Sequence, residues 1–396
     1  MSFFPFLRLD NYNKSNKGID ALKPGVYLYS SEILDRLSMF GSAAMNDRLE
    51  RDLYIGFEFR GKIPLLYQLG LAPTAAIEAF NITRKTGAQI ELGLDQVPVD
   101  VVYNLTEFDI SFRHPLFSEA SNLKFNFRHS MYSTDIGEFT NPDDNSSIPG
   151  SSSYYYIGNG LSLDWQYNGI VPSKTSAIRP VGTTIKFNYE YEFNEFNSTG
   201  DYEITPDGFV TPKFDNYRFH RAELEITHNM ELPGWRHTLS FDLHGGTIFG
   251  PPVPDFFDYY AGGLIGMKGY SMFAVGGNSI ASLNVTYRFP ISESLDTQVL
   301  QMYFDKLFGG IFFDAGDAWN DGIPKLTDFK KDIGAELRLQ SYSFYSLPTC
   351  ILVSGAYGLD KFDRMLNGRD ALATNQLISY GHEWRFYLTM LFDFEL

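Results

Sequence analysis

The chain has 396 residues, a formal net charge of -16 and an aromatic content of 16%. The acidic balance argues against nucleic-acid binding, which requires a basic surface, and the single cysteine, Cys350, excludes an internal disulfide framework or a cysteine-based zinc cluster. No apolar run approaches the roughly 18 to 20 residues that a membrane-spanning helix needs. The abundant Phe and Tyr favour strands and the aromatic girdles of membrane barrels instead.

Residues 1–24 form a lead segment ahead of the first predicted strand. They lack the charged start, the long apolar core and the small-residue cleavage site of a secretory signal. Because a protein of the bacterial outer membrane must be exported, we expect either a mature product or an excised domain that carries a starting Met.

Strict alternation of apolar and polar residues predicts strands over the rest of the chain. Residues 183–194 show it clearly, since Ile185 and Phe187 alternate with Lys186 and Asn188. The number of predicted strands is even, as in bacterial membrane barrels. The sixteen strands are expected near residues 25–32, 35–45, 52–60, 72–82, 86–96, 100–113, 121–133, 160–168, 181–194, 214–230, 235–249, 277–290, 300–316, 330–340, 349–358 and 381–396.

The connections between these strands alternate in length. Long polar segments follow odd-numbered strands, whereas the tight connections at 114–120 and 231–234 follow even-numbered ones. Outer-membrane barrels have long loops on one side and short turns on the other, and a soluble protein has no reason to obey this parity. The sequence therefore predicts an all-β, transmembrane antiparallel β-barrel over residues 25–396. The long segments are 134–159, 195–213, 250–276, 317–329 and 359–380.

A glycine-rich loop leads into an alternating strand at residues 262–290. Leu283 and Val285 belong to its apolar face, and Asn284 and Thr286 to its polar face. Several short motifs follow one another from here to the C-terminus: Gly-Gly at 262–263, Met-Lys-Gly-Tyr at 267–270, Gly-Gly-Asn at 276–278, Tyr-Arg-Phe-Pro at 287–290 and Phe-Asp-Ala-Gly-Asp-Ala-Trp at 313–319.

In this order, the motifs resemble the barrel domain of the BamA family of bacterial surface antigens over residues 262–396. Residues 23–40 show a looser resemblance to the barrel start in family members fused to a periplasmic propeller. The resemblance implies a sixteen-stranded barrel whose sixth extracellular loop folds back into the lumen and presents a basic residue to the inner wall. Carried over by position, the loop residues are Lys268, Gly269 and Tyr270, and the wall residues are Asn284, Phe312 and Asp314.

The chain departs from the family at both ends of this contact. Lys268 stands where the family has Arg, so a point charge replaces a planar fork of five donors. Asn284 stands where the family commonly has an acidic residue. Because one ammonium pairs well with one carboxylate, we expect a single ion pair between Lys268 and Asp314, assisted by Asn284. The alternative is that Lys268 is a solvated loop residue.

The C-terminal strand ends in an apolar face that resembles the assembly signal of outer-membrane barrels, although that signal usually ends in Phe or Trp. In the family, the first and last strands meet at a weak seam, and an unpaired edge there can template an incoming strand. The candidate seam lies between residues 24–32 and 382–396, and the alternative is a static, closed barrel. The apolar face comprises Phe386, Leu388, Met390, Phe392, Phe394 and Leu396.

Patterns typical of enzymes are weak in this chain. Residues 277–281 lack the final glycine of a nucleophile elbow, and the seven His have no metal-binding spacing. Asp143 and Asp144 could bind calcium, but a solvated loop is the more ordinary role. We expect no catalytic residue, cofactor or metal, and an integral hydrolase of the outer membrane remains a minor alternative.

Two main functions remain for a barrel in the outer membrane of a Gram-negative bacterium. The resemblance implies insertion, assembly or translocation of proteins, with outer-membrane lipids, unfolded outer-membrane proteins and periplasmic or lipoprotein accessory subunits as partners. The alternative is a passive anchor or channel for a missing periplasmic domain. Family insertases usually carry POTRA domains upstream, and the lead segment is too short for them, which weakens the insertase prediction and strengthens the anchor alternative.

Overall fold

The computed structural model describes residues 2–9, 18–92, 95–140, 146–171, 181–204, 210–233, 236–343, 347–366 and 376–392. The described residues are mostly β-structure, with a 17-stranded sheet, one short α-helix, α1 (Pro64–Gln68), and the 3-10 turns η1 (Gly18–Ala21), η2 (Asp255–Phe257) and η3 (Leu326–Asp328). None of the helices in these ranges is long and apolar enough to cross a membrane.

The chain divides into two compact units. Unit 1 comprises Met1–Asp164 and Glu190–His220, and unit 2 comprises Trp165–Tyr189 and Arg221–Leu396. Residues of both units occur in the strands β10 (Ser151–Val171), β11 (Val181–Phe196) and β14 (Asp215–Glu231). The short hairpins near them are β8 (Phe139–Thr140) with β9 (Ser147–Ile148) and β12 (Tyr202–Ile204) with β13 (Val210–Pro212).

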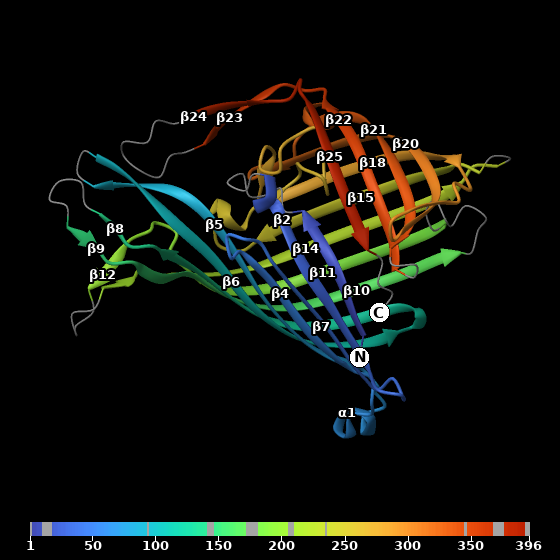
Figure 1. The fold of residues 1–396 in the computed structure, drawn as a ribbon, viewed down its shortest axis with the longest axis horizontal. Helices are drawn as coiled ribbons and strands as arrows, with labels where there is room; N and C mark the ends of the chain where they lie inside the picture. Colours follow the sequence, from blue (N-terminus) through green and yellow to red (C-terminus); the bar gives the residue numbers. More distant parts are fainter. Residues whose placement is uncertain are drawn as a thin grey trace. The chain divides into compact units, whose positions relative to one another are not determined.

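Unit 1 begins with a meander in which each strand pairs antiparallel with the next (Figure 1). Antiparallel neighbours need only short turns between them. Consecutive segments with an alternating pattern can therefore pair directly along this part of the sequence. The strands are β1 (Ser2–Leu9), β2 (Leu22–Ser31), β3 (Leu37–Met45), β4 (Arg51–Phe59), β5 (Thr74–Leu92), β6 (Asp95–Leu116) and β7 (Ser118–Ile136).

Unit 2 contains a second antiparallel meander, coloured yellow to red in Figure 1. It comprises β15 (Thr238–Phe249), β18 (Ser279–Ser292), β20 (Met302–Trp319), β21 (Lys330–Ser343), β22 (Leu347–Gly358) and β25 (Trp384–Phe392). The short pairs are β16 (Tyr259–Tyr260) with β17 (Gly276–Gly277), β19 (Thr297–Val299) with β20, and β23 (Phe362–Leu366) with β24 (Gln376–Tyr380).

The two faces of the strands are inverted relative to a soluble protein. On β4, Leu53, Ile55 and Phe57 are 40–41% exposed, whereas the neighbouring Asp52, whose side chain lies on the other face of the strand, is 7% exposed. Buried Asp and Glu side chains recur on the polar faces of other strands, as at Asp314 and Glu336. A sheet that exposes its apolar residues and buries its charged ones suits lipid outside and a polar interior. The predicted all-β class of a transmembrane barrel is therefore confirmed.

Most of two predicted strands, 72–82 and 86–96, forms one strand, β5, and residues 95 and 96 already belong to β6. The separation expected between them was wrong because the charged residues there are paired within the sheet. Arg84 lies 2.5 Å from the Asp52 carboxylate, and the Lys85 ammonium lies 3.0 Å from Asp100. The strand therefore continues through a stretch that looks like a polar turn.

The lead segment contains a strand that the sequence analysis did not predict. Pro5 argues against a strand in the run Ser2–Leu9, yet this run, β1, pairs with β2 along its whole length. The described residues thus hold sixteen strands of eight or more residues, as expected, because the missed strand compensates for the fused pair. The expected position of the seam changes as well: β2 is hydrogen-bonded to both β1 and β3, so the first strand of the sheet is β1, not residues 24–32.

Candidate functional site

The wall of the candidate site is a row of polar residues on neighbouring strands of unit 2. Asn284 on β18 stands opposite Asp314 on β20, which stands opposite Asp332 on β21. Asp314 is 1% exposed and Asp332 is 0% exposed. Buried carboxylates require nearby donors or cations, and most of those come from a loop.

That loop connects β15 to β18 and is closed at its base by the β16–β17 pair. Its tip is held by its own backbone: the N–H of Gly263 donates to the carbonyls of Met267 and Tyr270, at 3.1 and 3.0 Å. Gly263 has φ +92°, a conformation that favours glycine. Met267 and Tyr270 are fully buried, so the tip packs against the wall instead of projecting into solvent.

Lys268 at the tip makes both an ionic and a backbone contact with Asp314. Its Nζ lies 3.5 Å from Asp314 Oδ2, and its backbone N–H donates to the same oxygen at 3.3 Å. The ammonium also lies 4.3 Å from the centre of the Phe312 ring, a cation–π arrangement. The Tyr387 hydroxyl of β25 donates to the Lys268 carbonyl at 2.8 Å. Lys268 therefore contacts the wall instead of being a solvated loop residue.

Gly269 approaches the wall more closely than any side chain would allow. Its N–H donates to Asp332 Oδ2 at 2.8 Å. A Cβ at this position would lie 2.5 Å from the Asp332 Cβ and 2.8 Å from the Gly358 nitrogen, distances that real Cβ atoms do not show. Gly358 faces it across the contact, where a Cβ would lie 3.0 Å from the Gly269 carbonyl oxygen. Two glycines thus let two backbones meet.

The Tyr270 side chain joins the tip to the end of β22. Its hydroxyl lies 2.8 Å from the Lys331 carbonyl and 3.1 Å from the Asp360 carbonyl, and it accepts the Asp360 N–H at 3.0 Å. Burial raises the pKa of Tyr270 to about 12, so it remains a neutral donor at physiological pH. We call residues 267–270 together with Asn284, Phe312, Asp314 and Asp332 the loop latch.

Asn284 acts on the wall and not on the loop. Its amide donates to Asp314 Oδ1, and its own Oδ1 accepts the Thr286 hydroxyl at 2.8 Å. Lys268 contacts Asp314 Oδ2, and the Asn284 amide donates to the other oxygen, Oδ1. This arrangement fits the expectation that one ammonium pairs with one carboxylate.

Sequence reasoning missed Asp332 and Tyr387. The resemblance concerned the twelfth and thirteenth strands, whereas Asp332 lies on the fourteenth and Tyr387 on the sixteenth. Asp332 and Glu336 belong to the polar face of β21, within the alternating strand expected near residues 330–340. That signal identifies the face, but the pairing with Gly269 depends on the register between strands.

Two arginines from outside the latch hold the base of the loop. Arg221 Nη2 donates to the Phe257 carbonyl at 2.9 Å, and Arg364 Nη1 donates to the Phe273 carbonyl at 2.8 Å. Asp258 lies near both arginines. Burial, reinforced by nearby Asp255, raises the pKa of Asp258 from 3.8 to about 6, although Arg364 and Arg221 oppose the shift.

This shift makes the packing of the loop dependent on pH. Because the folded-state pKa of Asp258 is above its unfolded value, the folded state is favoured by protonation, and this contribution is lost as the pH rises from about 4 through about 6. We expect the Asp258→Asn variant to melt at a higher temperature than the wild type at pH 7.5 and at nearly the same temperature at pH 4. Thermal unfolding in detergent at both pH values measures this. An equal shift at both pH values would contradict it.

The C-terminal strand shows the predicted alternation where it is described. Phe386 and Leu388 are 76% and 57% exposed, and Tyr387 between them faces inward. The backbones of Met390 and Phe392 continue in register with Ile351 and Thr349 of β22. Phe394 and Leu396 lie outside the described residues.

Over the ranges given above, no three His, Cys, Asp or Glu side chains are grouped so that they could hold a metal ion. Asp143 and Asp144, the residues weighed for calcium, lie outside the described residues.

No family model and no curated protein matches this sequence. Among solved structures, CdiB from Escherichia coli matches with a TM-score of 0.54 at 12% identity, covering 98% of this chain and 63% of CdiB. CdiB from Acinetobacter baumannii matches with a TM-score of 0.47 at 10% identity, covering 93% of this chain and 57% of that one. The hemophore receptor HasR of Serratia marcescens, a double mutant in complex with HasA and heme, matches with a TM-score of 0.35 at 9% identity, covering 98% of this chain and 64% of HasR.

This chain thus spans less than two thirds of the length of each of these proteins. At such low identity, the likeness concerns the fold alone. The chain shares its antiparallel β fold with CdiB from Escherichia coli.

Proposed function

We propose that this chain is a barrel of the bacterial outer membrane, related to the BamA family, that mediates the insertion or translocation of proteins without a cofactor or an enzymatic step. The observation that carries the proposal is the loop latch. The loop tip docks against a buried polar wall through Lys268 and Gly269, which contact Asp314 and Asp332.

The contacts of the latch suit reversible docking. Each hydrogen bond is worth about 0.5–1.5 kcal/mol net, and those to charged groups about 1.5–3 kcal/mol, so together they hold the tip firmly. All of the polar groups involved can exchange these contacts for water in a wet lumen. We infer that docking shapes the interior for an unfolded protein substrate and that undocking changes the space available to it.

The strand edges supply a second element of the proposed mechanism. β25 carries lipid-facing residues such as Trp384, Phe386 and Leu388 on one face, and β1 is the first strand of the sheet. The edge of a terminal strand can template an incoming strand by main-chain hydrogen bonding. Proteins that insert into the membrane as strands are therefore the substrates that this architecture suits best.

The proposal is tested by reconstituting the protein into liposomes and adding a urea-denatured outer-membrane barrel. We expect the protein to accelerate folding of the barrel at least about tenfold over empty liposomes, equivalent to about 1.4 kcal/mol of barrier. The control variant is Lys325→Met, which removes an exposed lysine in the same unit. It should fold the substrate at the wild-type rate, whereas Lys268→Met should be slower.

A passive channel or anchor gives a different result. It would leave the folding rate equal to that of empty liposomes, and the two lysine variants would behave alike. Ion conductance across a planar bilayer would then identify the channel. This outcome would overturn the proposed insertion or translocation.

A further inference from the structure

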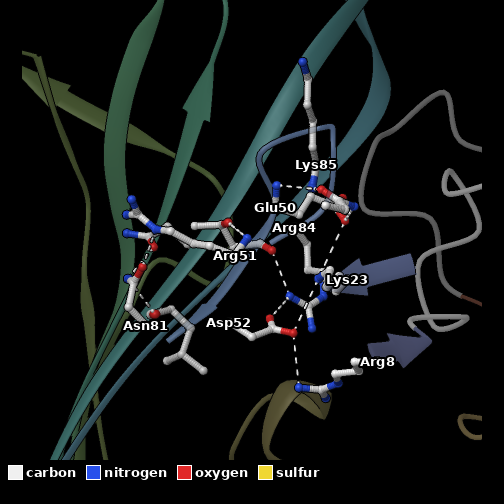
Figure 2. A network of polar contacts seen from close by, with 12 residues as sticks. Arg8, Lys23, Glu50, Arg51, Asp52, Asn81, Arg84 and Lys85 are labelled. Carbon is white, nitrogen blue, oxygen red and sulfur yellow. Dashed lines mark hydrogen bonds and ion pairs between the residues drawn. The ribbon is translucent and has the colours of Figure 1, made fainter. Parts of the chain in front are cut away.

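A second polar cluster lies in unit 1, far from the loop latch in sequence, and joins the β1–β2 hairpin to the strands beyond it. Lys23 on β2 is 0% exposed, a rare situation for a lysine. Its Nζ lies 3.5 Å from Asp52 Oδ2 and 3.8 Å from Glu50 Oε2. Figure 2 shows Lys23 between these carboxylates.

Asp52 collects cations from both sides. Arg8 on β1 lies 3.1 Å from its Oδ2, and Arg84 on β5 lies 2.5 Å from its Oδ1 (Figure 2). The hairpin thus contributes Arg8 and Lys23, which are also opposite one another in the β1–β2 register. The strands β4 and β5 contribute the carboxylate and a further arginine.

Glu50 is fixed in place by Asn46 and Lys85, and the Asn46 amide also donates to the carbonyl of Asp20, between β1 and β2, at 2.8 Å. Its carboxylate accepts the Asn46 amide at 2.9 Å and the Lys85 backbone N–H at 2.7 Å, and its own N–H donates to Asn46 Oδ1 at 2.9 Å. Glu50 is 1% exposed and Asn46 is 4% exposed. The carboxylates therefore form a preorganised socket, and Lys23 is the side chain that enters it.

The energetics of this arrangement differ from those of an apolar contact. Burying an ammonium and two carboxylates costs desolvation free energy, and their mutual attraction repays it only while the geometry is kept. If the hairpin moves away, the groups regain water. The opposite face of the hairpin carries exposed apolar side chains, with Phe3 at 62% and Leu7 at 55% exposed.

Aromatic stacking adds a second attachment on the polar side. The Phe6 and Tyr27 rings are 4.0 Å apart, and Tyr27 and Phe40 are 5.7 Å apart, which carries contact from β1 to β3. These stacks lie closer to the middle of the strands, whereas the charged cluster lies at the end where β1 finishes and β2 begins.

We propose that Lys23 is a positioning residue that fastens the β1–β2 hairpin to the rest of unit 1, and that loss of its charge releases this hairpin locally while the other strands remain folded. The device concerns the edge of the sheet and does not depend on the proposed function. Its movement would expose the backbone of β3, the strand to which β2 is hydrogen-bonded.

Hydrogen exchange of the full chain in detergent, read by mass spectrometry, tests this. Lys23→Met keeps the length of the side chain and removes the charge. We expect amide exchange in Ser2–Leu9 and Leu22–Ser31 to accelerate about tenfold or more, because two carboxylates lose their buried cation. Exchange in β6 and β7 should stay within about twofold of the wild type. Lys62→Met, which removes an exposed lysine of the same unit, should leave all segments unchanged.

A rescue experiment separates fastening from a general loss of fold. In the double variant Lys23→Met with Glu50→Gln, the buried side chain at position 50 no longer carries a negative charge that lacks the Lys23 ammonium. Protection of the hairpin amides should therefore return at least in part. Lys23→Arg should keep most of the protection. Equal acceleration in all strands, no acceleration in the hairpin, or a double variant worse than Lys23→Met would each overturn the proposal. Should Lys23→Met fail to fold, the Arg variant and the double variant still report on the hairpin.

Discussion

Replacing Gly269 with alanine is expected to expel the loop tip from the wall, with the largest effect of any single substitution in the loop latch. The added methyl group would lie 2.5 Å from the Asp332 Cβ and within 2.9 Å of the Gly358 backbone, so neither side can yield without moving a strand. The displaced tip would also lose the hydrogen bond from Gly269 to Asp332 and weaken the neighbouring contacts of Lys268. A loss of several kcal/mol in docking is expected from such overpacking together with the broken hydrogen bonds.

Limited trypsin digestion measures this release, because the peptide bond after Lys268 is shielded while the tip is docked. We expect the Gly269→Ala variant to be cut at this bond at least about a hundredfold faster than the wild type, equivalent to about 2.7 kcal/mol. The matched control is Gly245→Ala in β15, where the nearest atom to an added Cβ is 3.9 Å away. Wild-type protection of the Lys268 bond in Gly269→Ala would show that the tip is not seated as described.

The second large effect is expected from Asp314→Asn, which should destabilise the docked loop more than Lys268→Met does. Asp314 accepts three donors at once: the Lys268 ammonium, the Lys268 N–H and the Asn284 amide. Removing its charge leaves a poorly exposed ammonium without its counterion, at a cost of about 2–4 kcal/mol. Removing the ammonium leaves a carboxylate that keeps the other two donors, at a cost of about 1 kcal/mol.

A double-mutant cycle of these two substitutions measures the coupling. The double variant should be more stable than the sum of the single losses predicts, with a coupling of about 1–2 kcal/mol, because the cation and the anion leave together. The melting temperature in detergent reports it, together with the chymotrypsin protection of the bond after Tyr270, a cleavage site that both substitutions leave in place. Strict additivity would mean that the 3.5 Å contact carries no net interaction.

The strand pattern could be predicted largely from the sequence because a membrane barrel alternates faces residue by residue. Asn284 and Asp314 were assigned to the wall from alternation and family position, and both lie there. The fused strand β5 could not be predicted, because its charged stretch looks like a turn until Arg84 is seen against Asp52. β1 was missed since Pro5 is unusual within a strand.

The remainder of the candidate site depends on information that a single sequence does not carry. Asp332 and Tyr387 reach the loop tip because β20, β21, β22 and β25 adopt one particular register, and that register is set by pairings between distant segments. Alternation predicts on which face a residue lies, but not which residues of neighbouring strands stand opposite one another. The close approach of Gly269 to Gly358 is invisible for the same reason.

The role of the loop latch is tested by the rate at which the reconstituted protein folds a denatured barrel, measured across one series of loop-latch variants. We predict that the rate falls in the order wild type, Lys268→Met, Asp314→Asn, Gly269→Ala, which is the order in which docking of the loop is expected to weaken, while Gly245→Ala stays at the wild-type rate. A Gly269→Ala protein that inserts into the membrane, loses loop protection and still folds substrate at the wild-type rate would contradict the role of the loop latch.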